Sequence, residues 1–495
     1  MLINATVSAT SPPVDSDQDY GAITLAGAGG VALPGSETVI SNAGGTNLVV
    51  SGGFVVPDTG GGVTSGTVTF GGGTEWVVAA IADAYSTRSE AEITSAVAAG
   101  WSGKTILVRD GTYEWDYLWT RRKTFGGVGV GAILKAHNWR GATFTRDLSA
   151  VPPSFTVRSA SNFTIDGFVM LGSQFVMIRE TTYEIANITI QNCEIGGSTP
   201  IDETADWSGG LVGYSNGIVT NGGANTNLTI RNNYIHDCDV GIVVYDDGDL
   251  TIEGNHVLRC YEDTVKIASA ATDNVYIRDN FLSGVIGNGN DAGNPHPDFI
   301  QFVGVGVSGV IEIDRNIMLG WVARAGPQGV FLDDLGAGNY YTAKLRGNLL
   351  INDQSGSTTG LRVRQAENCE AYGNTVVGYN ESGGPGIQLG DDTTSGTHIS
   401  KNNAARDFTY GGTPTTANNI AMGLSGATVA YADAFVGADW AALSYADLLS
   451  VWSMKVAGDL DLATNVGAVG SGYVVWGSEP GQTDTYVAGT FGFTP

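Results

Sequence analysis

Asp263 and Asp298 are the two acidic residues whose spacing could support catalysis. Each stands directly before a similar strand-like phrase, Thr264-Val-Lys-Ile267 and Phe299-Ile-Gln-Phe302, so they occupy one position in consecutive repeats. Stacked at the strand spacing of about 4.8 Å, their carboxyl groups would approach the ~5–5.5 Å separation of retaining glycosidases. Mutual repulsion would then raise one pKa, as a general acid requires. The competing interpretation is that both aspartates accept hydrogen bonds from turn amides.

His296 is the candidate general base. It belongs to the insertion Asn288-Gly-Asn-Asp-Ala-Gly-Asn-Pro-His-Pro-Asp298, beside the second of these aspartates. Loop edges often carry function, and histidine has the side-chain pKa closest to neutrality. The histidines in or beside the repeated phrase described below are expected to be structural: His236, His256 and His398.

A second set of candidates is aligned by a phrase that reads small, apolar, any residue, apolar. Strand periodicity turns its third residue outward. One outward column therefore reads Val243, Lys266, Gln301, Phe331, Arg362 and Gln388, and the next reads Tyr245, Ala268, Val303, Asp333, Arg364 and Gly390. Cations, amides and aromatic rings together suit an oligosaccharide. The alternative is an ordinary surface ion pair between Asp333 and Arg364, one repeat apart.

Two reactions are open to these candidates. Hydrolysis of a glycosidic bond would use Asp263 and Asp298. Elimination from a uronic acid would instead use Lys266, Arg362 or His296 as the base. In that reaction Arg364 would neutralise the carboxylate of the substrate.

Metal and thiol chemistry have weaker signals. The acidic pairs Asp246-Asp247, Asp333-Asp334 and Asp391-Asp392 could give oxygen ligands to Ca²⁺, but none has an EF-hand pattern, so no cofactor is required. The four cysteines lack CxxC spacing, so we expect no zinc site. Cys238 and Cys260 should lie on adjacent repeats, as buried thiols or as a disulfide.

These residues are positioned by a repeat. An apolar residue, two polar or small residues and an asparagine recur seven times, and the asparagines are Asn233, Asn255, Asn280, Asn316, Asn348, Asn374 and Asn402. Spacings of 22 to 36 residues in a Gly-rich, strand-rich chain predict a stacked solenoid. The asparagines are expected to form an internal hydrogen-bonded ladder, with a structural and not a catalytic role.

A predicted helix precedes the coils. Ser89 and Glu92 form a capping box and Gly100 can end the helix, after which Lys104-Thr-Ile-Leu-Val-Arg-Asp-Gly-Thr-Tyr113 is typical of a strand and turn. This opening, with the coils up to about residue 410, resembles right-handed parallel β-helix proteins of the pectate-lyase-like superfamily. The resemblance implies an all-β, single-stranded, right-handed parallel β-helix with a short N-terminal capping helix and small β-rich terminal segments. That superfamily holds lyases, hydrolases, epimerases, isomerases and non-catalytic adhesins.

Three segments are expected. Residues 1–76 are Gly-rich with short β-type runs, Thr46-Asn-Leu-Val-Val-Ser51 and Gly66-Thr-Val-Thr-Phe70, and form an attachment segment. Residues 77–410 form the β-helix. Residues 411–495 form a closing or assembly region, with a second capped helix predicted over residues 444–454.

Charge and hydropathy limit the partners. The formal net charge of −26 over 495 residues argues against nucleic acid binding. No apolar run is long enough to span a membrane, and the N-terminus has no visible secretion signal. We therefore expect no membrane insertion.

The combined pattern resembles phage tail spikes and related virion fibres, which are usually trimers. That resemblance implies a virion-associated, receptor-binding homotrimer that recognises, and could depolymerise, host surface polysaccharide. Its N-terminal segment would bind other virion proteins. One alternative is a free polysaccharide lyase or glycoside hydrolase that is secreted; another is a non-catalytic structural adhesin.

Overall fold

The structure is a computed structural model of the 495-residue chain. It describes short strands and one turn, residues 139–141, between Leu2 and Val157, and most residues from Ser161 to Ala421 apart from gaps in the loops. The chain divides into two compact units, Met1–Ser198 and Thr199–Pro495, which we describe separately. The two predicted helices, His296 and two of the three acidic pairs lie outside the described residues.

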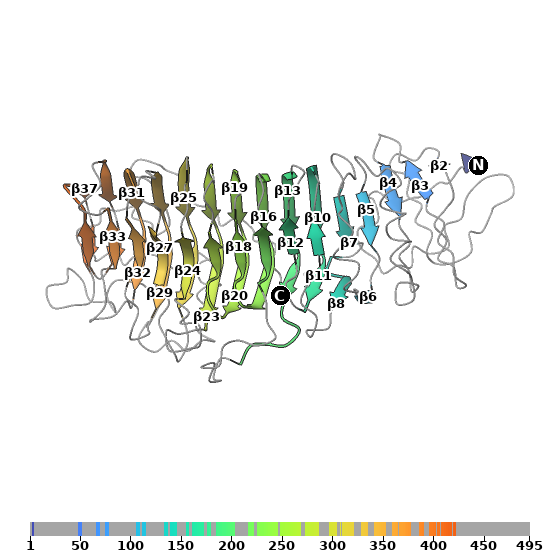
Figure 1. Cartoon of the computed structure of the whole chain (residues 1–495), viewed down its shortest axis with the longest axis horizontal. Coiled ribbons are helices and arrows are strands. Elements are labelled where there is room, and N and C mark those ends of the chain that lie inside the picture. Colours follow the sequence, from blue (N-terminus) through green and yellow to red (C-terminus); the bar gives the residue numbers. More distant parts are fainter. Residues whose placement is uncertain are drawn as a thin grey trace, which may run out of the picture. The chain divides into compact units, whose positions relative to one another are not determined.

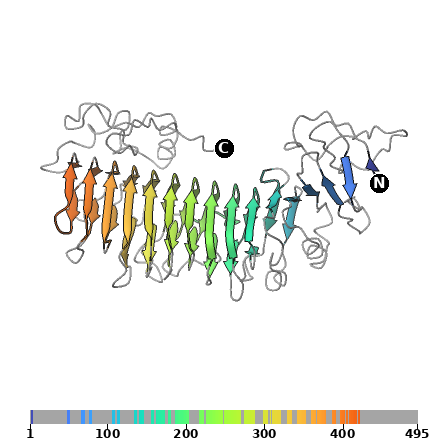
Figure 2. The same cartoon turned by 90° about the horizontal axis from the view of Figure 1, so that it is seen from above.

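Unit 2, which starts at Thr199, is built from three parallel sheets visited in turn by each coil (Figures 1 and 2). Sheet 1 contains β16 (Asn225–Arg231), β19 (Leu250–Glu253), β22 (Val275–Arg278), β25 (Val310–Asp314), β28 (Thr342–Arg346), β31 (Asn368–Tyr372), β34 (His398–Lys401) and β37 (Thr415–Ala417). Sheet 2 contains β17 (Tyr234–Cys238), β20 (His256–Cys260), β23 (Phe281–Val285), β26 (Ile317–Gly320), β29 (Leu349–Asn352), β32 (Thr375–Val377), β35 (Ala404–Ala405) and β38 (Ile420–Ala421). Sheet 3 contains β15 (Ile218–Asn221), β18 (Ile242–Val244), β21 (Val265–Ile267), β24 (Asp298–Val303), β27 (Gln328–Asp334), β30 (Leu361–Val363), β33 (Ile387–Leu389) and β36 (Phe408–Tyr410).

Unit 1 contains two kinds of strand pairing. Parallel coil strands comprise β5 (Thr105–Val108), β6 (Gly111–Glu114), β7 (Ile133–Ala136), β8 (Ala142–Thr145), β9 (Phe155–Val157), β10 (Ser161–Asp166), β11 (Val169–Leu171), β12 (Val176–Arg179), β13 (Ile185–Gln191) and β14 (Glu194–Gly196). Before them, β1 (Leu2–Ile3), β2 (Leu48–Ser51), β3 (Gly66–Thr69) and β4 (Glu75–Val78) pair antiparallel, and β4 then pairs parallel with β5. The predicted strand runs in the N-terminal segment are therefore present.

The core of unit 2 follows the alternation expected of strands. In β21, β22 and β30 the apolar residues are buried and the residues between them are half-buried. The apolar residue of the repeat is fully buried in successive coils, as Ile230, Ile252, Ile277, Ile313 and Leu345. Adjacent coils thus bury identical positions against one another, which confirms the predicted solenoid.

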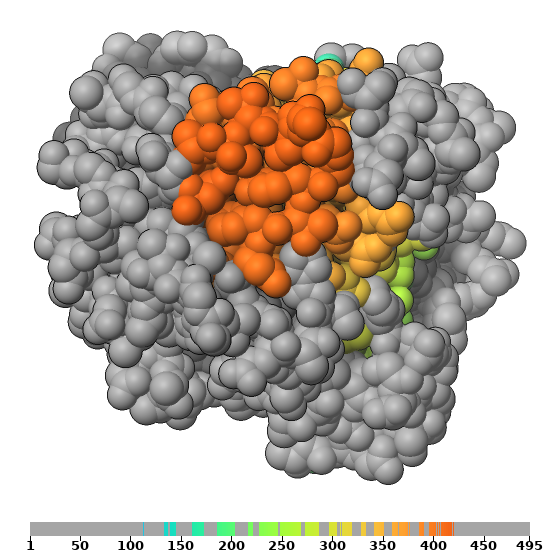
Figure 3. Space-filling model, turned by 90° about the vertical axis from the view of Figure 1, so that its left-hand side faces the viewer, coloured from blue at the N-terminus to red at the C-terminus, as the bar shows by residue number. Residues whose placement is uncertain are grey.

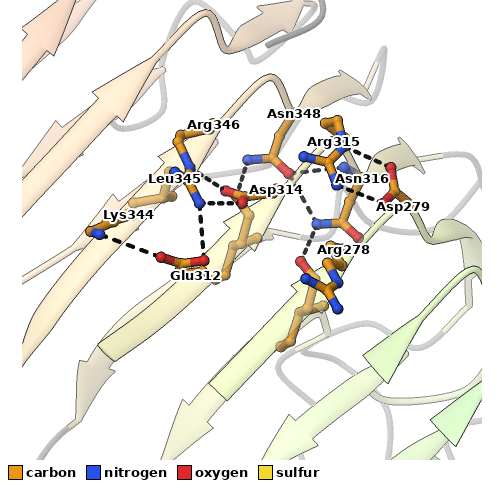
Figure 4. Close-up of polar contacts among 12 residues, drawn as sticks. Arg278, Asp279, Glu312, Asp314, Arg315, Asn316, Lys344, Leu345, Arg346 and Asn348 are labelled. Carbon is orange, nitrogen blue, oxygen red and sulfur yellow. Dashed lines mark hydrogen bonds and ion pairs between the residues drawn. The ribbon is translucent and has the colours of Figure 1, made fainter. Parts of the chain in front are cut away.

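The asparagine ladder is also confirmed, and Figure 4 shows part of it. Asn316 Nδ2 donates to Ile277 O (2.8 Å) and to Asn348 Oδ1 (3.0 Å). Asn316 Oδ1 accepts from both nitrogens of Asn280, at 3.0 Å from N and 2.9 Å from Nδ2. Each buried amide therefore has partners on both neighbouring coils, as burial of a polar group requires.

The last predicted rung was displaced by one residue. Ala371 pairs with Ser400, so the ladder continues through Asn403 instead of Asn402, and Asn374 N donates to Asn403 Oδ1 at 2.9 Å. Ser400 is fully buried where earlier coils place an apolar residue. Because strand side chains alternate with period 2, this shift by one residue turns Ile399 away from the core.

A left-handed residue precedes the ladder asparagine and makes the corner between sheets 1 and 2. The φ angles are 55° at Asn232, 64° at Gly254, 58° at Asp279, 54° at Arg315, 59° at Gly347 and 61° at Gly373. Gly, Asn and Asp tolerate this conformation best, which explains the residue types in the repeat. Arg315 is the exception, and its guanidinium donates to both carboxylate oxygens of Asp279 at 2.8 and 2.7 Å (Figure 4).

The cysteine prediction is settled in favour of thiols. Cys238 and Cys260 are register partners on adjacent coils, and all four cysteines are buried and free. Burial raises the pKa of both thiols well above its ordinary value. These groups are therefore small apolar elements of the core and not reactive thiolates.

We expect Asn316→Ala to lower the free energy of unfolding by about 2–4 kcal/mol, because it leaves buried donors and acceptors of two coils unsatisfied. Denaturant unfolding followed by circular dichroism measures the change. Asn368→Ala is the matched control, since Asn368 Oδ1 accepts only an exposed hydrogen bond from Thr397 N among the contacts described for it. Equal effects of the two substitutions would contradict the ladder's role.

Candidate functional site

The outward face of sheet 3 carries the predicted column of candidate ligands. Register pairs join Val243 to Lys266, Lys266 to Gln301, Gln301 to Phe331, Phe331 to Arg362 and Arg362 to Gln388. We call the residues Lys266, Gln301, Phe331, Arg362 and Gln388 the sheet 3 strip. Their alignment is confirmed pair by pair, and successive side chains start about 4.8 Å apart.

The second predicted column is interrupted. Val303 pairs with Asp334 and not with Asp333, because the register shifts after Phe302. Asp333 is thus the extra residue of a β-bulge, a feature that redirects side chains locally. Arg364 remains beside this point, since its N–H donates to Leu332 O at 2.9 Å.

Lys266 is held by two carboxylates. Its Nζ lies 2.8 Å from Glu262 Oε1 and 3.2 Å from Asp263 Oδ2. Burial alone would lower the pKa of Lys266, but Asp263 and Glu262 outweigh it and the pKa rises. Lys266 therefore carries its charge at neutral pH, the form that binds polar groups and not the form that accepts a proton.

Asp263 and Asp298 lie directly beneath the strip, both fully buried. Asp263 Oδ1 accepts from Asp298 N–H at 2.8 Å, the contact with a turn amide that was the alternative to catalysis. Gln301 Nε2 donates to Asp298 Oδ2 at 2.8 Å, so Lys266 and Gln301 each cover the carboxyl group three residues earlier. Burial, followed by repulsion from Asp298, raises the pKa of Asp263 well above its ordinary value.

A third acid near this pair is Asp239, which sequence reasoning missed. Glu262 N donates to Asp239 O at 2.8 Å, so the two acidic residues start on adjacent coils. Burial and then the charge of Glu262 raise the pKa of Asp239 to about 6, against an opposing effect of Lys266. The signal was available in the aligned repeats, where Asp239 and Glu262 both stand three residues before the first apolar residue of the phrase.

The other end of the strip combines a ring and a guanidinium. Arg362 Cζ lies 5.1 Å from the centroid of the Phe331 ring, a cation–π contact. Tyr341, buried behind it, donates its hydroxyl hydrogen to Arg364 O at 2.7 Å. This support fixes the backbone from which Arg364 extends.

A buried ion cluster on sheet 2 was also missed. Asp237 Oδ1 accepts from Arg259 Nε (2.7 Å) and Ile201 N (2.8 Å), and Asp237 Oδ2 lies 2.6 Å from His236 Nδ1. Burial would raise the pKa of Asp237, but hydrogen bonds from Arg259 and His236 lower it to about 2. His236 thus belongs to a structural cluster, in agreement with its predicted role.

Sheet 1 presents a different surface, one of paired charges (Figure 4). Arg278 lies 2.9 Å from Glu253, and Arg346 lies 3.0 Å from Glu312. Lys344 also contacts Glu312 at 3.4 Å. These pairs engage Arg278, Lys344 and Arg346 within the chain.

Among the residues that the structure describes, no group of three or more His, Cys, Asp or Glu side chains is placed to hold a metal. The side chains of Asp333 and Asp334 are not described. The Ca²⁺ site remains a prediction. Within the same part of the chain, no helix is long and apolar enough to cross a membrane.

The coil architecture agrees with one family model. Residues 155–291 match the model described as the right-handed β-helix region. The fold is a right-handed parallel β-helix. No curated protein matches the chain significantly.

Solved structures with similar coils include an alginate lyase from Paenibacillus sp., with 14% identity, a TM-score of 0.40, and coverage of 66% of this chain and 97% of that chain. The catalytic unit of an α-1,3-glucanase from Streptomyces thermodiastaticus has 11% identity, a TM-score of 0.41, and coverage of 67% and 65%. The surface protein and adhesin PfbA of Streptococcus pneumoniae has 13% identity, a TM-score of 0.37, and coverage of 69% and 94%. At this level of similarity, no activity or ligand is transferred to this chain.

The raised pKa of Asp239 predicts a pH-dependent stability. The folded state holds this proton more tightly than the unfolded state, where the pKa is 3.8, so the stabilisation is present at acidic pH and is lost as pH rises through about 6. We expect Asp239→Asn to raise the free energy of unfolding at pH 7 by on the order of 1–2 kcal/mol, measured by denaturant unfolding, and to change it little at pH 4. Asp273→Asn, at an exposed aspartate, is the control. A gain of equal size at both pH values would refute this origin.

The Asp237 cluster predicts the opposite pH behaviour. Its lowered pKa supplies stability above about pH 4 that is lost as pH falls towards 2. Arg259→Ala leaves a buried carboxylate without its bidentate partner and should cost about 3–5 kcal/mol at pH 7. Arg278→Ala, which removes a more exposed pair with Glu253, should cost about 0–1 kcal/mol. Thermal unfolding of the two variants compares them directly.

Proposed function

We propose that the protein is a virion-associated spike or fibre that binds a host surface polysaccharide along the sheet 3 strip. The observation that carries this proposal is the register-confirmed column Lys266, Gln301, Phe331, Arg362 and Gln388. Four coil spacings of about 4.8 Å give a strip roughly 19 Å long, enough for several sugar units in a row. Side chains that can bind a sugar therefore recur along the strip once per coil.

The chemistry of the strip suits sugar rings. The amide of Gln388 can donate to and accept from hydroxyl groups, and the charged amine of Lys266 donates only. Gln301 is 8% exposed and its Nε2 donates to Asp298, so its amide has to turn outward to reach a sugar. Phe331 offers an apolar ring, and Arg362 lies over that ring at 5.1 Å with a planar set of donors. Sheet 1 also has a cation–π contact, Arg278 over Tyr276 at 5.8 Å, but Arg278, Lys344 and Arg346 are engaged in ion pairs there, so we assign the polysaccharide to sheet 3.

Cleavage of the bound glycan is the second candidate function. The observation that favours it is the raised pKa of Asp263 beside Asp298, which is the protonation state a general acid needs. Both carboxyl groups are covered by Lys266 and Gln301, so hydrolysis requires these two side chains to move aside. A lyase would instead use His296 as its base, because Lys266 is held in the charged form and the guanidinium of Arg362 keeps its proton at any working pH.

The assembly proposed with this function is a homotrimer exposed on the virion surface. Residues 1–76 would attach it to other virion proteins, and no nucleic acid or membrane would be bound. Deleting residues 1–76 should abolish incorporation into particles while leaving glycan binding intact. Incorporation of the shortened chain would remove the virion assignment and favour a secreted enzyme or adhesin.

Binding to a panel of purified bacterial surface polysaccharides tests the central proposal. Phe331→Ala and Arg362→Ala should each weaken binding of a glycan that wild-type protein retains, by at least about fivefold or ~1 kcal/mol. Lys344→Ala, on sheet 1, is the matched control and should bind like wild type. Unchanged binding by both strip variants would place the glycan site elsewhere.

The same samples separate binding from cleavage. New reducing ends without ultraviolet absorbance indicate hydrolysis, and unsaturated ends that absorb in the ultraviolet indicate elimination. Asp263→Asn should abolish hydrolysis while preserving binding. Retention of glycan with no product of either kind would leave a non-catalytic adhesin.

A further inference from the structure

The described coils end in three open edge strands. β37, β38 and β36 are the last strands of sheets 1, 2 and 3. Figure 3 looks onto this end, where residues of the last coil form an exposed surface. The side chains of Thr415 and Thr416 in β37 are exposed. An open edge presents unpaired backbone donors and acceptors, so a further strand is expected to cover it.

These edges lack the features that protect natural open edges. Such edges are usually blocked by charged residues or proline within the strand. β36 reads Phe-Thr-Tyr, β37 reads Thr-Thr-Ala and β38 reads Ile-Ala, with no charge and no proline among them. The composition is that of paired strands, not of a terminal edge exposed to solvent.

The asparagine ladder is unfinished at the same place. At every interior rung from Asn233 to Asn403, the backbone N–H donates to Oδ1 of the next asparagine, as from Asn403 to Asn419 at 3.0 Å. Within the described residues, no next asparagine receives the N–H of Asn419. Its Nδ2 donates to Ser400 O at 2.9 Å, as earlier rungs donate to the preceding coil, but its contact with Tyr410 Oη at 3.1 Å takes the place of the bond to a next asparagine. One more rung would complete the pattern.

The sequence contains that rung beyond the described coils. Asp459-Leu-Asp-Leu-Ala-Thr-Asn465 matches Asp249-Leu-Thr-Ile-Glu-Gly-Asn255 in its first aspartate, its two apolar positions and its final asparagine. Asn465 is the only asparagine after Asn419. In the structure Asp249 Oδ1 accepts from the N–H of Asn274 on the next coil at 3.1 Å, so its position in the phrase also has a defined role.

We propose that residues 459–465 dock on the open edge as a further coil strand, parallel to β37, with Asn465 completing the ladder on Asn419. The chain leaves the described coils at Ala421, in the outermost strand of sheet 2, so the following residues start at this edge. From Asn419 to Asn465 is 46 residues, against at most 36 between earlier rungs. The additional residues between these two rungs leave room for the helix predicted over residues 444–454.

Hydrogen exchange of the full chain tests this docking. Asn465→Ala should accelerate exchange of the Asn419 amide and of the β37 amides at least tenfold, because it removes the acceptor of the Asn419 amide and weakens the docking of the strand that covers β37. Asp461→Ala is the matched control, since it changes an outward position of the same phrase and should leave these rates unchanged. Fast exchange of β37 in wild-type protein, with no change in Asn465→Ala, would overturn the proposal.

A cross-link identifies the occupant of the edge. Register predicts that Ala463 lies beside Ala417, as Ala417 lies beside Lys401. The double variant Ala417→Cys and Ala463→Cys should form a disulfide within one chain under mild oxidation. A disulfide-linked dimer would assign the edge to a second copy of the chain, and no cross-link of either kind would leave it to another protein. Both results contradict the proposal.

Discussion

Each coil of unit 2 depends on the buried amide at the corner between sheets 1 and 2. A left-handed residue turns the chain there, and the asparagine that follows bonds the coil before and the coil after it. A buried amide without these partners would cost a large part of the stability of a coil. The corner therefore fixes the register of each coil relative to the next. Equivalent residues on all three sheets are aligned between coils for this reason.

Stacking with fixed register forces equivalent residues of neighbouring coils into contact. On sheet 1 the chain exploits this with alternating charges, Arg231, Glu253, Arg278, Asp314 and Arg346 in register order. Opposite charges at this spacing attract, so neighbouring members of the column stabilise one another. On sheet 3 the same rule stacks Asp263 on Asp298, and the repulsion between like groups becomes a raised pKa.

The link between the strip and the buried acids also follows from the repeat. A strand residue that points outward lies three positions after a residue at the turn, so Lys266 covers Asp263 and Gln301 covers Asp298. A ligand bound on the strip would replace or move the groups that shield the carboxyl pair. Under the proposed function, glycan binding would therefore act directly on the groups that shield the two buried acids.

The sequence alone determined the features that depend on period. The spacing of the asparagines predicted the coils, and strand alternation predicted the register partners from Val243 to Gln388, although Val243 and Gln301 are buried and not exposed. Only the tertiary structure showed the one-residue register shifts and the contacts between side chains that are distant in the sequence. The extra residue at Asp333 and the shift from Asn402 to Asn403 each change the register by one residue, which a repeat pattern cannot reveal. The charge state of Lys266 and the Asp237 cluster depend on which side chains converge in space, and this only the folded backbone fixes.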